Sequence, residues 1–113
     1  MGWTSWSASD LGRGIGRGEI DPEALAQVFL DAIAAHPDRD RIYARVTPER
    51  ALAEARAAGL RAKVGRRLSL LDGVPVSWKD LFDTAGVATE AGSALLKGRV
   101  PERDADVLRT ASA

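Results

Sequence analysis

One lysine in the sequence has a position and a chemical type that could serve chemistry. Lys79 follows the apolar segment 74–78 and is itself followed by two acids, Asp80 and Asp83. Only three of the sixteen basic residues are lysines, and the others are arginines. Arginine keeps its proton at any usable pH, whereas a buried lysine can lose it. Lys79 therefore invites a chemical role; the structural alternative is an inert side chain that reaches water.

The element that positions Lys79 is predicted from the alternation of apolar residues. Asp72-Gly73 is a turn signal, and the residues after it alternate as in a strand with one buried face. The apolar residues of that face are Val74, Val76 and Trp78. We therefore expect a strand over residues 74–78, with Lys79 at its end on the opposite face. Residues 42–46 alternate in the same way and predict a second strand.

Local start and stop signals predict four helices: two before the strand at 42–46, one between the two strands, and one after residue 103. The four expected N-cap residues are Ser7, Asp21, Thr47 and Asp104. The second helix would end at His36-Pro37 and the third between residues 59 and 65. The second helix carries an apolar stripe at three- and four-residue spacing: Leu25, Val28, Phe29, Ala32 and Ile33. The last helix would bury Val107 and Leu108, and the alternation of helices and strands is typical of an α/β domain.

Two other features have both a functional and a structural interpretation. Gly12, Gly14 and Gly16 have a spacing like that of a phosphate-binding loop, but such loops need a preceding apolar strand that residues 1–9 do not supply. Close packing of a helix explains these glycines better. His36 has no acidic or histidine partner at a useful spacing, so we interpret it as a structural residue near a helix C-terminus.

The composition narrows the available chemistry. Sixteen basic and sixteen acidic residues cancel, so we expect no direct binding to nucleic acid or to an anionic membrane. The absence of cysteine and the single histidine exclude thiol chemistry and histidine-rich metal sites. Catalysis would use hydroxyl, carboxylate or amine groups without a cofactor. No apolar run reaches the ~18 residues of a membrane span, and no secretion signal is evident, which predicts a cytoplasmic protein.

Nearly the whole chain after residue 6 resembles the N-terminal portion of amidase-signature enzymes, a family of Ser-cis-Ser-Lys amide hydrolases. The most specific match is Gly73-Val74-Pro75-Val76-Ser77-Trp78-Lys79-Asp80-Leu81-Phe82-Asp83. Weaker matches are residues 7–11, 18–22, 49–55, 85–86, 91–93, 96–98 and 104–107. Trp78 and Glu90 depart from the residues that the family uses most often, and neither change removes a catalytic group.

The resemblance implies an α/β fold with helices around a mixed β-sheet, of which residues 1–113 would be the N-terminal portion of a single domain. It also implies that Lys79 is the catalytic lysine of a triad that hydrolyses a small-molecule amide to an acid and ammonia or an amine. In the family, the two serines and the oxyanion hole come from a downstream segment rich in glycine and serine. Residues 1–113 contain no such segment, so we expect them to be inactive and marginally folded on their own.

Several alternatives stay open at this point. Ser77 shares a strand face with Lys79, but a dyad would require the lysine to fold back, and Ser93 is interpreted as a turn or cap hydroxyl. The glutamine-hydrolysing subunit of a tRNA-dependent amidotransferase resembles these enzymes over the same stretch; Trp78 and the leader at residues 3–6 favour a free-standing amidase. A non-catalytic interaction module is the alternative of another class. A homodimer through the N-terminal helices is compatible with the sequence.

Overall fold

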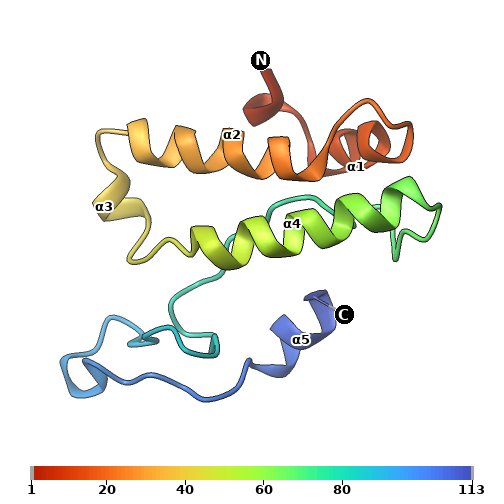
Figure 1. Cartoon of the computed structure of the whole chain (residues 1–113). Helices are drawn as coiled ribbons and strands as arrows, with labels where there is room; N and C mark the ends of the chain where they lie inside the picture. Colours follow the sequence, from red (N-terminus) through yellow and green to blue (C-terminus); the bar gives the residue numbers. More distant parts are fainter. Residues whose placement is uncertain (1, 113) are drawn as a thin grey trace. The chain divides into compact units, whose positions relative to one another are not determined.

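The computed structural model describes residues 2–112, most of which lie in helices and the turns between them (Figure 1). The elements in chain order are η1 (Gly2–Ser5), α1 (Ala8–Gly16), α2 (Pro22–Ala35), α3 (Arg39–Ile42), α4 (Pro48–Lys63), η2 (Ala94–Leu96) and α5 (Asp106–Ser112). The chain divides into two compact units, one up to Val76 and one from Ser77 on.

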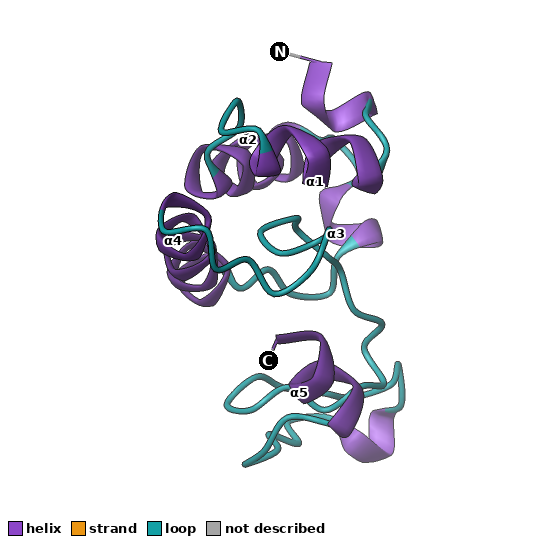
Figure 2. Ribbon diagram, turned by 90° about the vertical axis from the view of Figure 1, so that its right-hand side faces the viewer, coloured by secondary structure: helices purple, strands orange, loops and turns teal. Residues whose placement is uncertain are grey.

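The first unit is built on two long helices that run antiparallel and side by side, α2 and α4 (Figures 1 and 2). Helix α4 turns small buried residues inward, Ala55, Ala58 and Gly59, which allow a close approach between helix backbones. The core of the unit consists of Leu11, Ile15, Ile20 and Leu25, with Trp3, Phe29, Ala62 and Val74 packed around it. Of the apolar stripe expected on α2, Leu25 is fully buried, whereas Ala32 is exposed.

The predicted helix signals of this unit are confirmed at most positions. Asp21 caps α2 by accepting a hydrogen bond from the Ala24 N–H at 3.0 Å, and α2 ends at Ala35, just before His36. Helix α4 begins after Thr47 and ends at Lys63, within the predicted window, but the Thr47 side chain makes no capping hydrogen bond. Ser7 accepts a hydrogen bond from the Asp10 N–H, as expected. The Asp10 carboxylate, however, accepts a hydrogen bond from Arg13, its neighbour on the helix surface.

The glycines of α1 serve close packing, as predicted. A Cβ atom on Gly12 would overlap the carbonyl oxygen of Leu70, which belongs to the turn that precedes Gly73. A Cβ on Gly14 would lie 2.5 Å from Ile20 Cδ1, too close for any real pair of carbon atoms. Backbone and core side chains therefore occupy the space that a side chain at either position would need.

The two strand predictions are wrong for the described residues. Ile42 closes the short helix α3, and residues 43–47 and 74–79 are irregular. Within residues 2–112 the only β-type pairing is an isolated bridge between Thr84 and Val87. A strand needs a partner to take up its backbone hydrogen bonds, and the described residues place no extended segment beside either one. Val76, expected in the buried face, is 67% exposed.

The turn before Gly73 is the best-anchored loop of the first unit. The Asp72 carboxylate accepts two hydrogen bonds from Arg61 of α4, at 2.9 and 2.8 Å, and a third from the Leu68 N–H at 3.0 Å. Its side chain is only 7% exposed. The hydrogen bonds from Arg61 hold the pKa of Asp72 below its ordinary value, against the opposing effect of burial.

Gly73 completes this turn with a conformation that favours glycine. Its φ angle is +97°, and an added Cβ would lie 3.0 Å from Pro22 Cγ and 3.2 Å from Ile15 Cδ1. The Val74 N–H then donates to the Leu71 carbonyl at 3.0 Å and closes the turn. The Asp72-Gly73 turn signal is therefore confirmed, and tertiary packing adds a second reason for the glycine.

We expect Gly12→Ala to destabilise the protein by about 1–3 kcal/mol, because the methyl group meets a backbone carbonyl that cannot move by itself. The matched control is Gly16→Ala at the end of the same helix. Its methyl group would lie 2.9 Å from Nη1 of Arg67, a flexible side chain whose Nη2 donates hydrogen bonds to the Leu70 and Asp72 carbonyls. Because that side chain can shift and alanine favours a helix more than glycine does, we expect a smaller loss than for Gly12→Ala. Urea unfolding of the two variants and the wild type measures the difference. Equal stability of Gly12→Ala and wild type would contradict the packing.

Replacement of Asp72 by asparagine tests the buried ion pair. We expect a loss of roughly 2 kcal/mol near pH 7, because Arg61 loses a charged partner. A carboxyl with a lowered folded-state pKa stabilises the protein above its unfolded pKa of about 3.9 and loses that contribution as the pH falls through the folded value. The stabilities of the wild type and Asp72→Asn should therefore start to converge below about pH 4 and meet below the folded-state pKa of Asp72. The control Asp106→Asn removes a carboxylate that is 95% exposed and should change little.

Candidate functional site

Lys79 lies near the start of the second unit, in a turn rather than at the end of a strand. Its carbonyl oxygen accepts a hydrogen bond from the Phe82 N–H at 3.2 Å, and its side chain is exposed. The ring of Trp78 contacts Phe82 edge to face, with centroids 5.8 Å apart. Trp78 and Phe82 thus pack across the turn that presents Lys79 to solvent.

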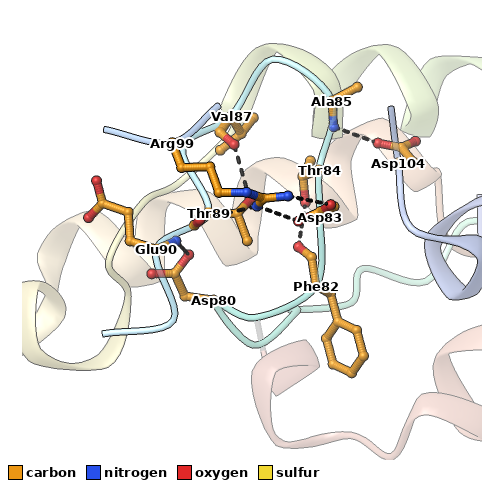
Figure 3. A network of polar contacts seen from close by, with 10 residues as sticks. All are labelled: Asp80, Phe82, Asp83, Thr84, Ala85, Val87, Thr89, Glu90, Arg99 and Asp104. Atoms are coloured by element: carbon orange, nitrogen blue, oxygen red, sulfur yellow. Dashed lines mark hydrogen bonds and ion pairs between the residues drawn. The ribbon is translucent and has the colours of Figure 1, made fainter. Parts of the chain in front are cut away.

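The two acids after Lys79 hold this turn in place (Figure 3). The Asp80 carbonyl accepts a hydrogen bond from the Ala91 N–H at 2.7 Å. The Asp80 carboxylate accepts a second one from the Glu90 N–H at 3.2 Å. Asp83 accepts two hydrogen bonds from Arg99 in a forked arrangement, at 2.7 and 2.9 Å. These hydrogen bonds from Arg99 hold the pKa of Asp83 below its ordinary value. Both acids of the motif therefore have a structural role.

Arg99 connects Asp83 to a buried part of the same loop. The Arg99 carbonyl accepts a hydrogen bond from the Thr89 N–H at 2.9 Å, and the Arg99 Nη1 lies 3.4 Å from the Thr89 carbonyl oxygen. Thr89 is only 4% exposed and donates its hydroxyl to the Val87 carbonyl at 3.1 Å. The guanidinium thus joins the residues just after Lys79 to the centre of the second unit (Figure 3).

The C-terminal end of the second unit joins the same network. The Asp104 carboxylate accepts a hydrogen bond from the Ala85 N–H at 2.8 Å, and the Ala105 N–H donates to the Asp83 carbonyl at 2.8 Å. Helix α5 begins at Asp106, two residues after the N-cap predicted from the sequence. Leu108 is 1% exposed, as predicted, whereas Val107 is 44% exposed.

The other residues considered from the sequence have ordinary structural contacts. Ser93 accepts a hydrogen bond from the Leu95 N–H and caps η2, which confirms its interpretation as a cap hydroxyl. His36 Nδ1 accepts a hydrogen bond from the Asp38 N–H at 3.0 Å. Ser77 is exposed like Lys79, and the dyad of these two residues stays untested. In the part of the chain that the structure describes, no group of three or more histidines and acids is arranged to hold a metal ion.

Sequence reasoning missed Arg99 and Thr89. Arg99 lies sixteen residues from Asp83 along the chain, and it carries no local signal that separates it from the other arginines. Thr89 stands in an ordinary loop sequence.

Among residues 2–112, no helix has the length and apolar character needed to cross a membrane.

Comparison with known families identifies the family of this chain. The model of the family described as Amidase matches residues 24–113, a range that includes the whole Lys79 turn. The chain belongs to the amidase signature family. Its membership rests on most of the chain and not on the lysine motif alone.

Several curated relatives of this amidase-signature chain are named as a subunit of glutamyl-tRNA(Gln) amidotransferase. The protein of Salinispora arenicola is 41% identical over 106 residues, which are 94% of this chain and 22% of the relative. That of Myxococcus xanthus is 40% identical over 109 residues, or 96% and 22% of the two chains. An Anaeromyxobacter protein is 42% identical over 99 residues, or 88% and 20%. The chain therefore spans about a fifth of these relatives, and no solved structure matches it.

Proposed function

We propose that residues 1–113 are the N-terminal part of an enzyme that hydrolyses a carboxylic amide to an acid and ammonia or an amine, with Lys79 as its catalytic lysine. Membership of the amidase signature family carries this proposal. The surroundings of Lys79 support it, because Asp80 and Asp83 fix the turn that carries the lysine. The α/β sheet of the fold and the two catalytic serines would come from residues outside this chain.

In the proposed reaction, Lys79 acts as the general base at the end of a proton relay. Lys79 takes a proton from a serine in a cis peptide. That serine in turn takes a proton from the second serine, which attacks the amide carbonyl. The amine leaves with a proton, and water then releases the acid from the acyl-enzyme. A lysine can act in this way only when it is neutral, a form that burial favours. Because Lys79 is exposed in the second unit, the rest of the enzyme would have to cover it.

A second candidate function is the glutamine-hydrolysing subunit of a tRNA-dependent amidotransferase. The names of the relatives favour it, since the most similar ones cited above are amidotransferase subunits at about 40% identity. Trp78 and the leader at residues 3–6 favour the free-standing amidase. Both candidates use the same lysine and need no cofactor.

The cytoplasmic location, the small-molecule amide as substrate and a homodimer stay predictions.

In the full-length enzyme we expect Lys79→Ala to lower kcat for amide hydrolysis by at least about a thousandfold, because the relay loses its base. Lys97→Ala is the matched control: Lys97 is an exposed lysine of the same unit and should leave kcat unchanged. Release of ammonia, measured under saturating amide, gives the rates. Substantial activity in Lys79→Ala would contradict the proposal. Turnover by residues 1–113 alone would also contradict it, because the triad would then not be needed.

The two candidate functions differ in their need for partner subunits. A free-standing amidase should hydrolyse simple amides as a purified full-length protein, at a rate that added tRNA does not change. An amidotransferase subunit should prefer glutamine and reach full activity only with its partner subunits and a misacylated tRNA. Ammonia release from glutamine and from short aliphatic or aromatic amides separates them. We expect turnover of simple amides without partners; activity on glutamine alone, dependent on partners, would favour the second candidate.

A further inference from the structure

We infer that Asp83 and Arg99 form a positioning pair for Lys79: they fix the turn that carries the lysine without touching the substrate. The inference rests on the proposed function, because it assigns a task to this pair in the reaction of Lys79. It follows from the contacts within the second unit, all of which join residues between 79 and 105 (Figure 3).

The pair acts at the end of the turn that begins with Lys79. The hydrogen bond from the Phe82 N–H to the Lys79 carbonyl closes the turn, and Asp83 is the next residue. Both carboxylate oxygens of Asp83 accept hydrogen bonds from one guanidinium, a geometry that fixes direction as well as distance. The exit of the turn therefore has a defined position and orientation.

Arg99 is itself held by the backbone on both sides of the loop. Its N–H donates to the Leu96 carbonyl at 3.0 Å, and its carbonyl accepts from the Thr89 N–H at 2.9 Å. Thr89 is almost fully buried, so Arg99 is attached to a well-packed residue of the second unit. Asp83 is thus fastened to a fixed point and not to a free surface side chain.

A second anchor holds the start of the same turn. The carboxylate of Asp80 accepts the Glu90 N–H, and the Glu90 carboxylate accepts the Gly98 N–H at 2.6 Å. The turn is therefore held at Asp80 and at Asp83 by neighbouring parts of one loop. Release of either end would let the backbone of Lys79 shift, and a displacement of about 1 Å in a catalytic group can cost about a hundredfold in rate.

The exposure of the pair separates positioning from stability. The Arg99 side chain is 43% exposed and that of Asp83 is 36% exposed, and ion pairs this open to solvent add little to stability. Loss of the pair should therefore leave the protein folded while the turn becomes mobile. A residue with only a structural role would instead lower the amount of folded enzyme and leave kcat per active site unchanged.

The test is made in the full-length enzyme, with active sites counted by burst amplitude. We expect Arg99→Ala to lower kcat about tenfold to a hundredfold, with KM within about twofold of wild type because the pair does not bind substrate. Arg99→Lys should recover part of the loss, since lysine keeps the charge but not the forked geometry. The control is Arg109→Ala. It removes an exposed ion pair of the same unit, in which Arg109 Nη1 lies 3.6 Å from Asp106 Oδ1, and it should leave kcat unchanged.

The combination with Asp83→Asn shows whether the two residues act together. The double variant should lose no more activity than Arg99→Ala alone, because either change breaks the same contact. Three results would each overturn the inference. They are an unchanged kcat in Arg99→Ala, a change confined to KM or to burst amplitude, and losses that multiply in the double variant.

Lys79→Ala separates a failure of the proposed function from a failure of the positioning pair. If Lys79→Ala stays active, the proposed function is wrong; if it is inactive while Arg99→Ala is fully active, only the positioning pair is wrong.

Discussion

The first unit depends on one buried carboxylate. The Asp72 side chain is 7% exposed, and a charge with so little access to water is stable only with partners that satisfy its oxygens. Arg61 supplies two hydrogen bonds from α4 and the Leu68 N–H supplies a third. The turn around Asp72 must therefore lie against α4. That location in turn puts the Leu70 carbonyl over Gly12 and Gly73 against Pro22, so the glycines of two distant segments follow from one ion pair.

The two units use the same chemical device for different purposes. Each contains an aspartate of the Lys79 region that accepts a forked pair of hydrogen bonds from an arginine, Arg61 for Asp72 and Arg99 for Asp83. The first pair is shielded on the carboxylate side, so its loss should affect the free energy of unfolding. The second is more open to water, where screening lowers its contribution to the free energy of unfolding. Its effect should therefore be seen in the reaction of Lys79 and not in stability.

The acids of the Lys79 turn have a structural task. In the proposed reaction Lys79 is the base, and Asp80 and Asp83 hold the turn that carries it. A base must hold its position relative to groups supplied by other parts of the enzyme. The acids therefore contribute to the proposed hydrolysis through the backbone that they fix, and Lys79 contributes through its amine.

Features that depend on neighbouring residues could be predicted from the sequence. The start of α2 at Asp21-Pro22, its end before His36-Pro37, the turn at Asp72-Gly73 and the cap at Ser93 all rest on contacts within a few residues, and local geometry decides them. The family and its candidate lysine also came from the sequence. That residues 74–78 form no strand was visible only after folding, because pairing requires a partner from elsewhere. Folding also joined Asp72 to Arg61 and Asp83 to Arg99, eleven and sixteen residues apart, since no local signal marks which arginine a carboxylate will meet.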